Sequence, residues 1–437
     1  MAEQRPKRPH LRPLQYLVTG GKLLPRGLSH VMVANIAQQV LAFAGVLFIA
    51  RLLPAEQFAL VRIALAYAAV ATILGAGGLT APILRYCADP ELNDVQRRSL
   101  LGKALLWLLL FSALAAICAG VLVFLSGRGS DETLVLLAYA LQIPALAATS
   151  LLLVYLQAVQ RFRFLAYFQI VLRGLTLCLT AVGAWFFGLE GLLVATVFAV
   201  FGGAVPLWLA ARPSFKPSAT NVPSDFSSLA RYSLIGMLIT TVGQYADLLL
   251  LDWLAPERNQ IGAYSLATIF FFAASALAGA VQSVATPHFT GLMKDRNAFK
   301  SALRRWSYGL IVAGAVAAIG TTTFAWIVEK LFLSAAYEGL GIMVGILMLR
   351  FWIWCSYAVG GAAMVGIGAI KQGTLVACIT TGVAYMAGYP LVLWAGVWGA
   401  AATQVIVALV SAALVFWIIA VETRKLPLVA DDKGVRT

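Results

Sequence analysis

The sequence predicts an all-α, polytopic membrane protein with 12 transmembrane helices in two six-helix lobes. Three observations support this prediction. First, the chain of 437 residues is 61% hydrophobic and 11% charged, with a mean hydropathy of +0.87, which excludes a water-soluble globule. Second, a helical crossing needs about 20 apolar residues, and the chain contains 12 such runs. Third, a hairpin pattern near the start returns roughly two hundred residues later, which indicates a duplicated unit.

The 12 apolar runs divide into two sets of six at a stretch rich in Pro and Ser. We expect spans at 28–50, 58–82, 103–125, 133–156, 166–187, 189–211, 228–254, 260–287, 305–332, 339–368, 373–394 and 396–420. The expected organisation is a basic tail at 1–27, an N-terminal lobe at 28–212, a linker at 213–227, a C-terminal lobe at 228–420 and a tail at 421–437.

The positive charges predict the orientation of the chain. Of its 32 Lys and Arg residues, 25 fall on the side shared by both tails. Cytoplasmic loops carry the excess of Lys and Arg, so both termini are expected in the cytoplasm. This asymmetry explains the net charge of +14 by contact with membrane lipids and without a nucleic-acid partner. Four basic residues lie in the opposite loops and three within spans: Arg51, Arg128, Arg258 and Lys330, then Arg62, Arg173 and Arg350.

Cysteine and histidine give no sign of a metal or a cofactor. The five cysteines are scattered without a CxxC pair, and the three histidines lie far apart. Ligands of a structural metal are usually closely spaced in pairs, so we expect no metal site and no cofactor.

The duplicated hairpins indicate a transporter that works between its two halves. The first runs from Arg51 to Tyr86 with a turn at Pro54, and the second runs from Asp252 to Phe289. The halves also end alike, in glycine-rich segments that begin at Gly188 and Gly396.

Polar side chains within the apolar runs are the candidate substrate site, because such groups are costly in hydrocarbon. Arg350 is expected near mid-membrane and Arg173 nearer the cytoplasm, and an arginine at either place can hold phosphate. Arg62 could instead extend to the outer headgroups, the aromatic residues could stack on sugars or simply pack, and the amides could join helices. The candidates are Arg350, Arg173, Arg62, Trp354, Tyr357, Asn35, Gln38, Gln244 and Gln282.

Two acidic positions are singled out. Asp247 follows Thr240 and Gln244 on one helix face, where it either pairs with an arginine such as Arg62 or binds a coupling cation. The Asp131-Glu132 pair stands alone at a helix start, where its simplest role is to interact with the helix dipole.

The hairpin residues resemble a known family. The first hairpin, RLLPAEQF from Arg51 followed by Gly78-Leu79 and Arg85-Tyr86, looks like the amino-terminal signature of polysaccharide transporters. IGAYSLA from Ile261 looks like the matching hairpin of the second half, and LQAVQR from Leu156 resembles the connection between the fourth and fifth helices. These transporters belong to the multidrug/oligosaccharidyl-lipid/polysaccharide (MOP) exporter superfamily. Arg62 is not part of the family pattern.

The resemblance implies a MATE-like bundle of two six-helix lobes around a central cationic cavity that opens alternately to each side. The implied activity is flipping of an undecaprenyl-diphosphate-linked oligosaccharide across the bacterial inner membrane, for O-antigen, capsule or exopolysaccharide assembly. The implied partners are this lipid-linked glycan, membrane lipids and other polysaccharide-assembly proteins.

Three alternatives remain open. A drug or cation antiporter of the same superfamily would use Asp247 as its proton or sodium site. A flippase of peptidoglycan precursors usually has two further helices. A membrane glycosyltransferase or polymerase would need catalytic carboxylates on a sizeable loop, and the short outer loops here favour a protein that is not an enzyme.

Overall fold

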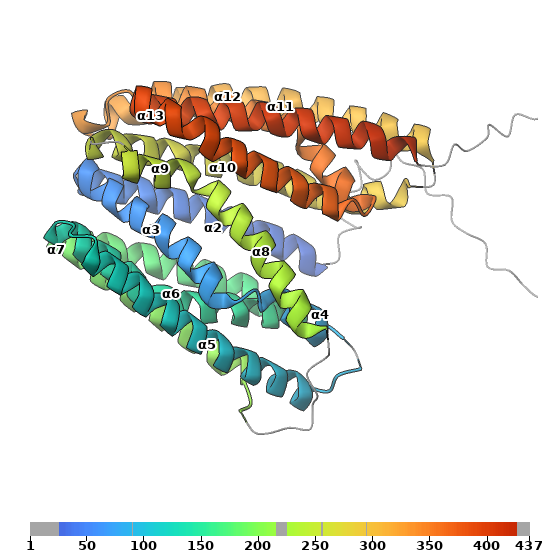
Figure 1. Ribbon diagram of the computed structural model, residues 1–437, viewed down its shortest axis with the longest axis horizontal. Helices are drawn as coiled ribbons and strands as arrows, with labels where there is room; N and C mark the ends of the chain where they lie inside the picture. The colour runs from blue at the N-terminus through green and yellow to red at the C-terminus, as the bar shows by residue number, and fades with distance from the viewer. Residues whose placement is uncertain (1–25, 90, 216–224, 255–256, 294, 426–437) are drawn as a thin grey trace, which may run out of the picture.

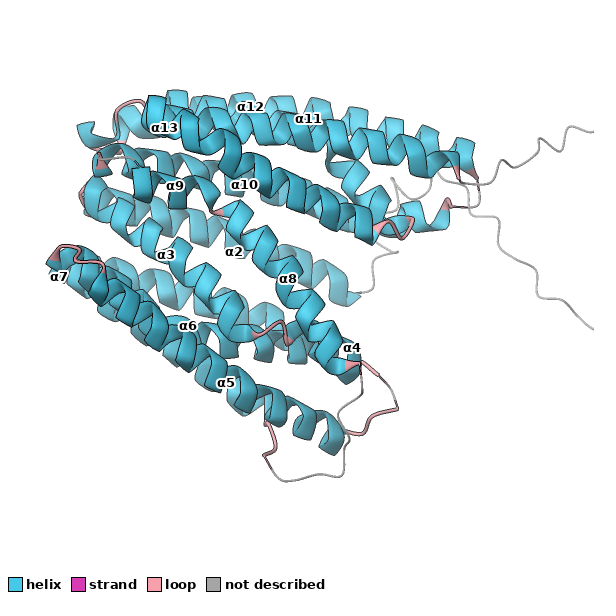
Figure 2. Cartoon of the chain, viewed as in Figure 1, coloured by secondary structure: helices cyan, strands magenta, loops and turns pink. Residues whose placement is uncertain are grey.

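The computed structural model describes residues 26–89, 91–215, 225–254, 257–293 and 295–425, and within them the regular structure is helical (Figure 2). The helices of the first half are α2 (Arg26–Leu52), α3 (Ala55–Ala76), α4 (Thr80–Cys87), α5 (Asp94–Leu125), α6 (Ser130–Ala158) and α7 (Phe162–Ala211). Those of the second half are α8 (Phe226–Gln244), α9 (Ala246–Leu254), α10 (Arg258–Gly291), α11 (Arg296–Leu331), the 3-10 turn η1 (Ala335–Tyr337), α12 (Leu340–Gly366) and α13 (Ile370–Arg424).

The helices confirm an all-α, multi-pass membrane protein. In the described part of the chain, seven helices are long and apolar enough to cross a membrane, and the bent pair α8–α9 makes an eighth. The longest helices, α7 with 50 residues and α13 with 55, are interrupted at Gly188 (φ 58°) and Gly396 (φ 55°). Positive φ is readily adopted only by glycine, so the breaks fall where the sequence predicts paired spans to meet. The count of 12 crossings stays a prediction.

The helices form two groups that converge at one end and diverge at the other (Figure 1). We call the first the closed end; it carries the ends of α2, α5, α9 and α11 and the starts of α3, α6, α10 and α12. The opposite end is called the splayed end. One group is α5 to α7, the other is α10 to α13, and α2, α3, α8 and α9 lie between them (Figure 1).

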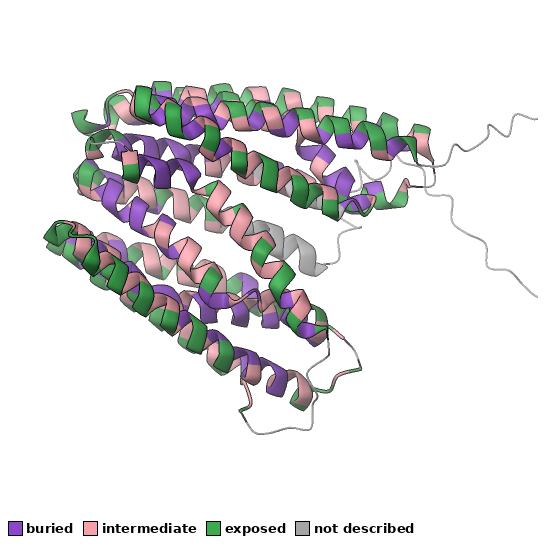
Figure 3. Cartoon of the chain, viewed as in Figure 1, coloured by how far each residue is buried: buried purple, intermediate pink, exposed green. Residues whose placement is uncertain are grey.

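At the closed end, residues of both halves share one core. Seven consecutive residues of α9, from Ala246 to Asp252, are buried (Figure 3). The start of α3 packs into the core of the second half, and the ring of Phe58 lies 6.3 Å from that of Tyr337. Gly262 rests on the backbone of Ala55, and a Cβ atom at Gly262 would lie 2.2 Å from the Ala55 carbonyl oxygen. A larger residue there would separate the two hairpin tips.

Helix α8 connects the two halves obliquely. It makes an angle of 55° with α9 at Tyr245, and its opposite end packs on α3 and α4 of the first half (Figure 1). There Asp225 accepts a hydrogen bond from Tyr86 and pairs with Arg85 at 3.5 Å. The Tyr86 hydroxyl lowers the pKa of Asp225 below its usual value. We call this contact the α4–α8 clasp.

The domain boundaries stay a prediction, because the tails and most of the linker lie outside the described residues.

The sides of the membrane that the closed end and the splayed end face can be tested by labelling. With the five native cysteines replaced, Ser130→Cys and Glu257→Cys at the closed end are expected to react in intact cells with a maleimide that does not cross the cytoplasmic membrane. Asp89→Cys at the splayed end is expected to react only after lysis. Protection of both closed-end positions would overturn the topology.

Candidate functional site

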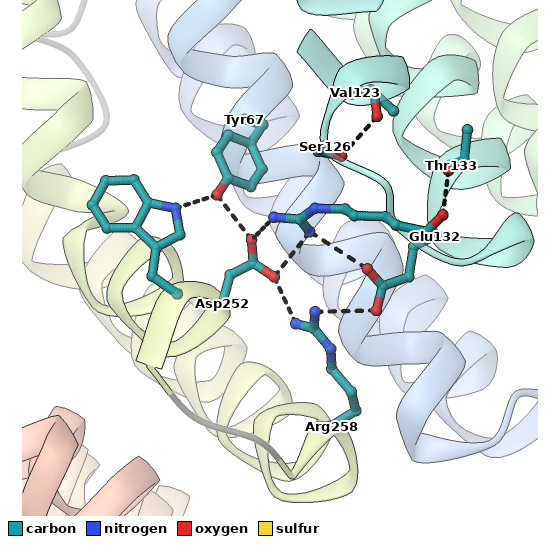
Figure 4. Close-up of polar contacts among 9 residues, drawn as sticks. Tyr67, Val123, Ser126, Glu132, Thr133, Asp252 and Arg258 are labelled. Carbon is teal, nitrogen blue, oxygen red and sulfur yellow. Dashed lines mark hydrogen bonds and ion pairs between the residues drawn. The ribbon is translucent and has the colours of Figure 1, made fainter.

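A largely buried network of ion pairs joins the halves at the closed end (Figure 4). The side chain of Asp252, at the end of α9, is completely buried. Its carboxylate accepts hydrogen bonds from Arg128, with Nη2 2.7 Å from Oδ2, and from Arg258, with Nη1 2.6 Å from Oδ1. Tyr67 of α3 donates to Oδ2 at 2.8 Å, and Glu132 of α6 binds Arg258 at 3.1 Å. Every charge in the network therefore has a partner, as burial demands.

A second contact of the closed end mirrors the first. Arg51 lies in the last turn of α2 and Asp252 in the last turn of α9, and the two residues stand at equivalent positions of the repeated hairpin. Arg51 donates to the backbone carbonyl of Phe332, after α11, and its guanidinium lies 4.8 Å from the centre of the Phe332 ring. Asp252 reaches Arg128, after α5, which is the corresponding place in the other half. The closed end is thus fastened by two reciprocal contacts.

A group of charges lies deeper between the halves. Asp247, buried in the first turn of α9, accepts a hydrogen bond from the Leu248 amide at 2.8 Å and from the Tyr264 hydroxyl at 2.6 Å. Its helix packs against α3, which carries Arg62, and its partner Tyr264 lies on α10 two turns from Phe271, the ring beneath Arg350 of α12. Among the described residues, no ion pair within 4 Å joins Asp247 to either arginine, so the direct pairing of Arg62 with Asp247 is absent from this conformation.

The two guanidiniums lack hydrogen-bond acceptors. The Nε atom of Arg62 is buried without a partner, and no hydrogen bond links either guanidinium to another residue of the described chain. Arg350 lies over the Phe271 ring, 4.1 Å from its centre. A cation–π contact offsets only part of the desolvation of a guanidinium. Two arginines from opposite halves are therefore available to an anion.

A model of the family described as "Polysaccharide biosynthesis protein" matches residues 24–293, more than half of the chain. The chain belongs to the polysaccharide biosynthesis protein family. No curated protein matches it by sequence.

Solved structures of transporters share the fold of this polysaccharide biosynthesis protein. The lipid II flippase MurJ in an inward closed conformation matches with a TM-score of 0.74 at 12% identity, over 90% of this chain and 88% of that chain. An inward-facing multidrug resistance MATE family transporter of the MOP superfamily gives 0.69 at 13%, over 89% and 95%. A MOP superfamily transporter from Pyrococcus furiosus gives 0.64 at 14%, over 92% and 96%. The fold is that of MOP transporters, as the hairpin motifs predict.

Of the other predicted site residues, four contact neighbouring helices and two are exposed. Gln282 donates to the carbonyl of Ala358 at 2.8 Å, and Gln38 bonds to Gln169 at 3.3 Å, so both amides join helices. Trp354 packs against the second-half core, and Tyr357 packs beside α13. Arg173 and Gln244 are exposed, and the side chain of Asn35 lies outside the described residues. Binding of substrate by these seven residues stays a prediction.

The structure corrects the interpretation of Glu132, and the network around Asp252 was not predicted from the sequence. Glu132 does not stand alone at the start of α6, because it pairs with Arg258 at 3.1 Å and with Arg128 at 3.6 Å. One feature of the sequence could have predicted these contacts. Arginine is rare in outer loops, and three of the four basic residues placed there, Arg51, Arg128 and Arg258, contact the opposite half or a group that does.

Proposed function

We propose that this protein is a flippase for an undecaprenyl-diphosphate-linked oligosaccharide repeat unit, which it moves from the cytoplasmic to the periplasmic leaflet of the bacterial inner membrane. The observation that carries the proposal is the pair of half-buried arginines, Arg62 and Arg350, which come from opposite halves and lack hydrogen-bond acceptors among the described residues. A guanidinium can hold two phosphate oxygens at once, so a diphosphate fits this pair.

The arrangement of the halves supports alternating access. In the proposed orientation the closed end faces the periplasm, and the splayed end faces the cytoplasm with both termini. Arg173, exposed on α7 in the half opposite Arg350, would meet the phosphate first. The headgroup would then pass to Arg350, which the helical rise places about 15 Å from the start of α12. The lipid tail can stay in the bilayer, since only the glycan and the diphosphate need a polar path.

Two properties of the relatives favour this proposal over others. The family is named for polysaccharide biosynthesis, and one structural neighbour is described as a lipid II flippase. A drug or cation antiporter would share the fold and would use Asp247 as its ion site, and it remains the second candidate because another neighbour is a multidrug transporter. A catalytic role has no support from these relatives.

Deletion of the gene separates the two candidates. A flippase deletion is expected to cause undecaprenyl-linked oligosaccharide to accumulate on the cytoplasmic side of the membrane, and surface glycan to fall, with drug sensitivity unchanged. A plasmid copy should restore the glycan. Unchanged lipid-linked oligosaccharide together with increased drug sensitivity would favour the antiporter instead.

A further inference from the structure

The position of Asp247 is unusual for a site that receives an anion. Tyr264, which bonds to Asp247, lies on α10 two turns from the Phe271 ring beneath Arg350, and α9 packs against α3, which carries Arg62, so two positive charges and one negative charge share this region. Yet the carboxylate bonds to neither guanidinium; it is held by the Leu248 amide and the Tyr264 hydroxyl. Tyr264 is itself completely buried in α10, which leaves the Asp247 carboxylate little freedom to turn.

The hydrogen bonds of Asp247 also hold its carboxylate in place without a cation. One oxygen accepts from a backbone amide and the other from a phenol, so both oxygens already have donors. The positive charges of Arg62 and Arg350 in the same region oppose a second cation. A bound sodium ion would need several oxygen ligands in this place.

We propose that Asp247 is a fixed counter-charge that lowers the affinity of Arg62 and Arg350 for the diphosphate, so that the substrate can leave after the halves reorient. This inference rests on the proposed function. A transport site must bind strongly enough to load and weakly enough to release. Two half-buried guanidiniums alone would bind the dianionic diphosphate tightly. A carboxylate fixed near them repels the diphosphate, whichever side of the membrane the site is open to.

Tyr264 has the matching positioning role. Its hydroxyl keeps the carboxylate away from the guanidiniums, so that Asp247 weakens anion binding without neutralising either arginine by a direct bond. In Tyr264→Phe the carboxylate is free to turn toward an arginine and compete with the phosphate. The two substitutions therefore have opposite effects: Asp247→Asn strengthens binding, and Tyr264→Phe weakens it.

The test measures the binding of undecaprenyl diphosphate to the purified full-length protein in lipid nanodiscs. Asp247→Asn is expected to bind roughly tenfold more tightly than the wild type, because a nearby negative charge has been removed, and to transport more slowly in cells. Tyr264→Phe is expected to bind several-fold more weakly. Glu190→Gln, which removes an exposed carboxylate of α7, is the control and should bind as the wild type does.

The other outcomes would contradict the counter-charge, or both the counter-charge and the proposed function. Equal or weaker binding by Asp247→Asn, with the wild type binding well, overturns the counter-charge and leaves the proposed function intact. Binding by the wild type that requires sodium, with the requirement lost in Asp247→Asn, assigns the residue to a coupling cation and also overturns it. If neither protein binds the lipid, both the inference and the proposed function are wrong. A general loss of structure cannot imitate the expected result, since it would weaken binding in both variants.

Discussion

Replacement of Arg350 by alanine is expected to reduce glycan export at least tenfold while folded protein remains in the membrane. The guanidinium has no hydrogen-bond partner among the described residues, so its removal leaves no acceptor unpaired and takes away the Phe271 contact and one positive charge near Asp247. Arg350→Lys should retain part of the activity, because lysine keeps the charge and loses the planar fork. Arg62→Ala is expected to have a similar effect, and Arg173→Ala a smaller one, since Arg173 lies exposed and away from the pair.

Export must be measured together with the amount of folded protein, for example by surface glycan staining and fluorescence-detected gel filtration of the same cells. Arg163→Ala, an exposed arginine in the first turn of α7, is the matched control. Full export by well-folded Arg62→Ala and Arg350→Ala variants would remove both residues from the mechanism.

Neutralisation of Asp252 is expected to open the closed end. Asp252→Asn leaves Arg128 and Arg258 largely buried with half of their partners lost, and breaking such a pair typically costs about 3 kcal/mol. The penalty applies only while the halves are together at this end, because a separated end exposes both arginines to water. The equilibrium should therefore shift toward the conformation that is open on the periplasmic side.

A cysteine at Ala55, which is 1% exposed beneath Gly262, reports this opening. In a background without native cysteines, Ala55→Cys is expected to react slowly with an external maleimide, and the addition of Asp252→Asn should accelerate the reaction at least tenfold. Asp131→Asn, which changes an exposed carboxylate at the same end, is the control. Equal labelling with and without the Asp252 change would show that the network does not hold the closed end.

The sequence predicted the features that depend on local chemistry. Apolar runs set the helices, and Gly188 and Gly396 mark the breaks because positive φ favours glycine. The hairpin repeat predicted two related halves. Contacts such as Arg128 with Asp252, 124 positions apart, could not be predicted, because they depend on how the halves meet. The bend at Tyr245 could not be predicted either, because helix α8 contains no proline there.

The length of helix α8 sets how far its end at α4 moves when the angle at Tyr245 changes. Its 19 residues make a rod about 28 Å long, fixed at one end beside Asp247 and at the other by the α4–α8 clasp. A change of about 10° in the angle at Tyr245 would displace the far end by about 5 Å, given that length. Helix α8 then acts as a lever that pivots at Tyr245, close to Asp247. A small rotation there moves the end of the helix at α4 by about one helical turn.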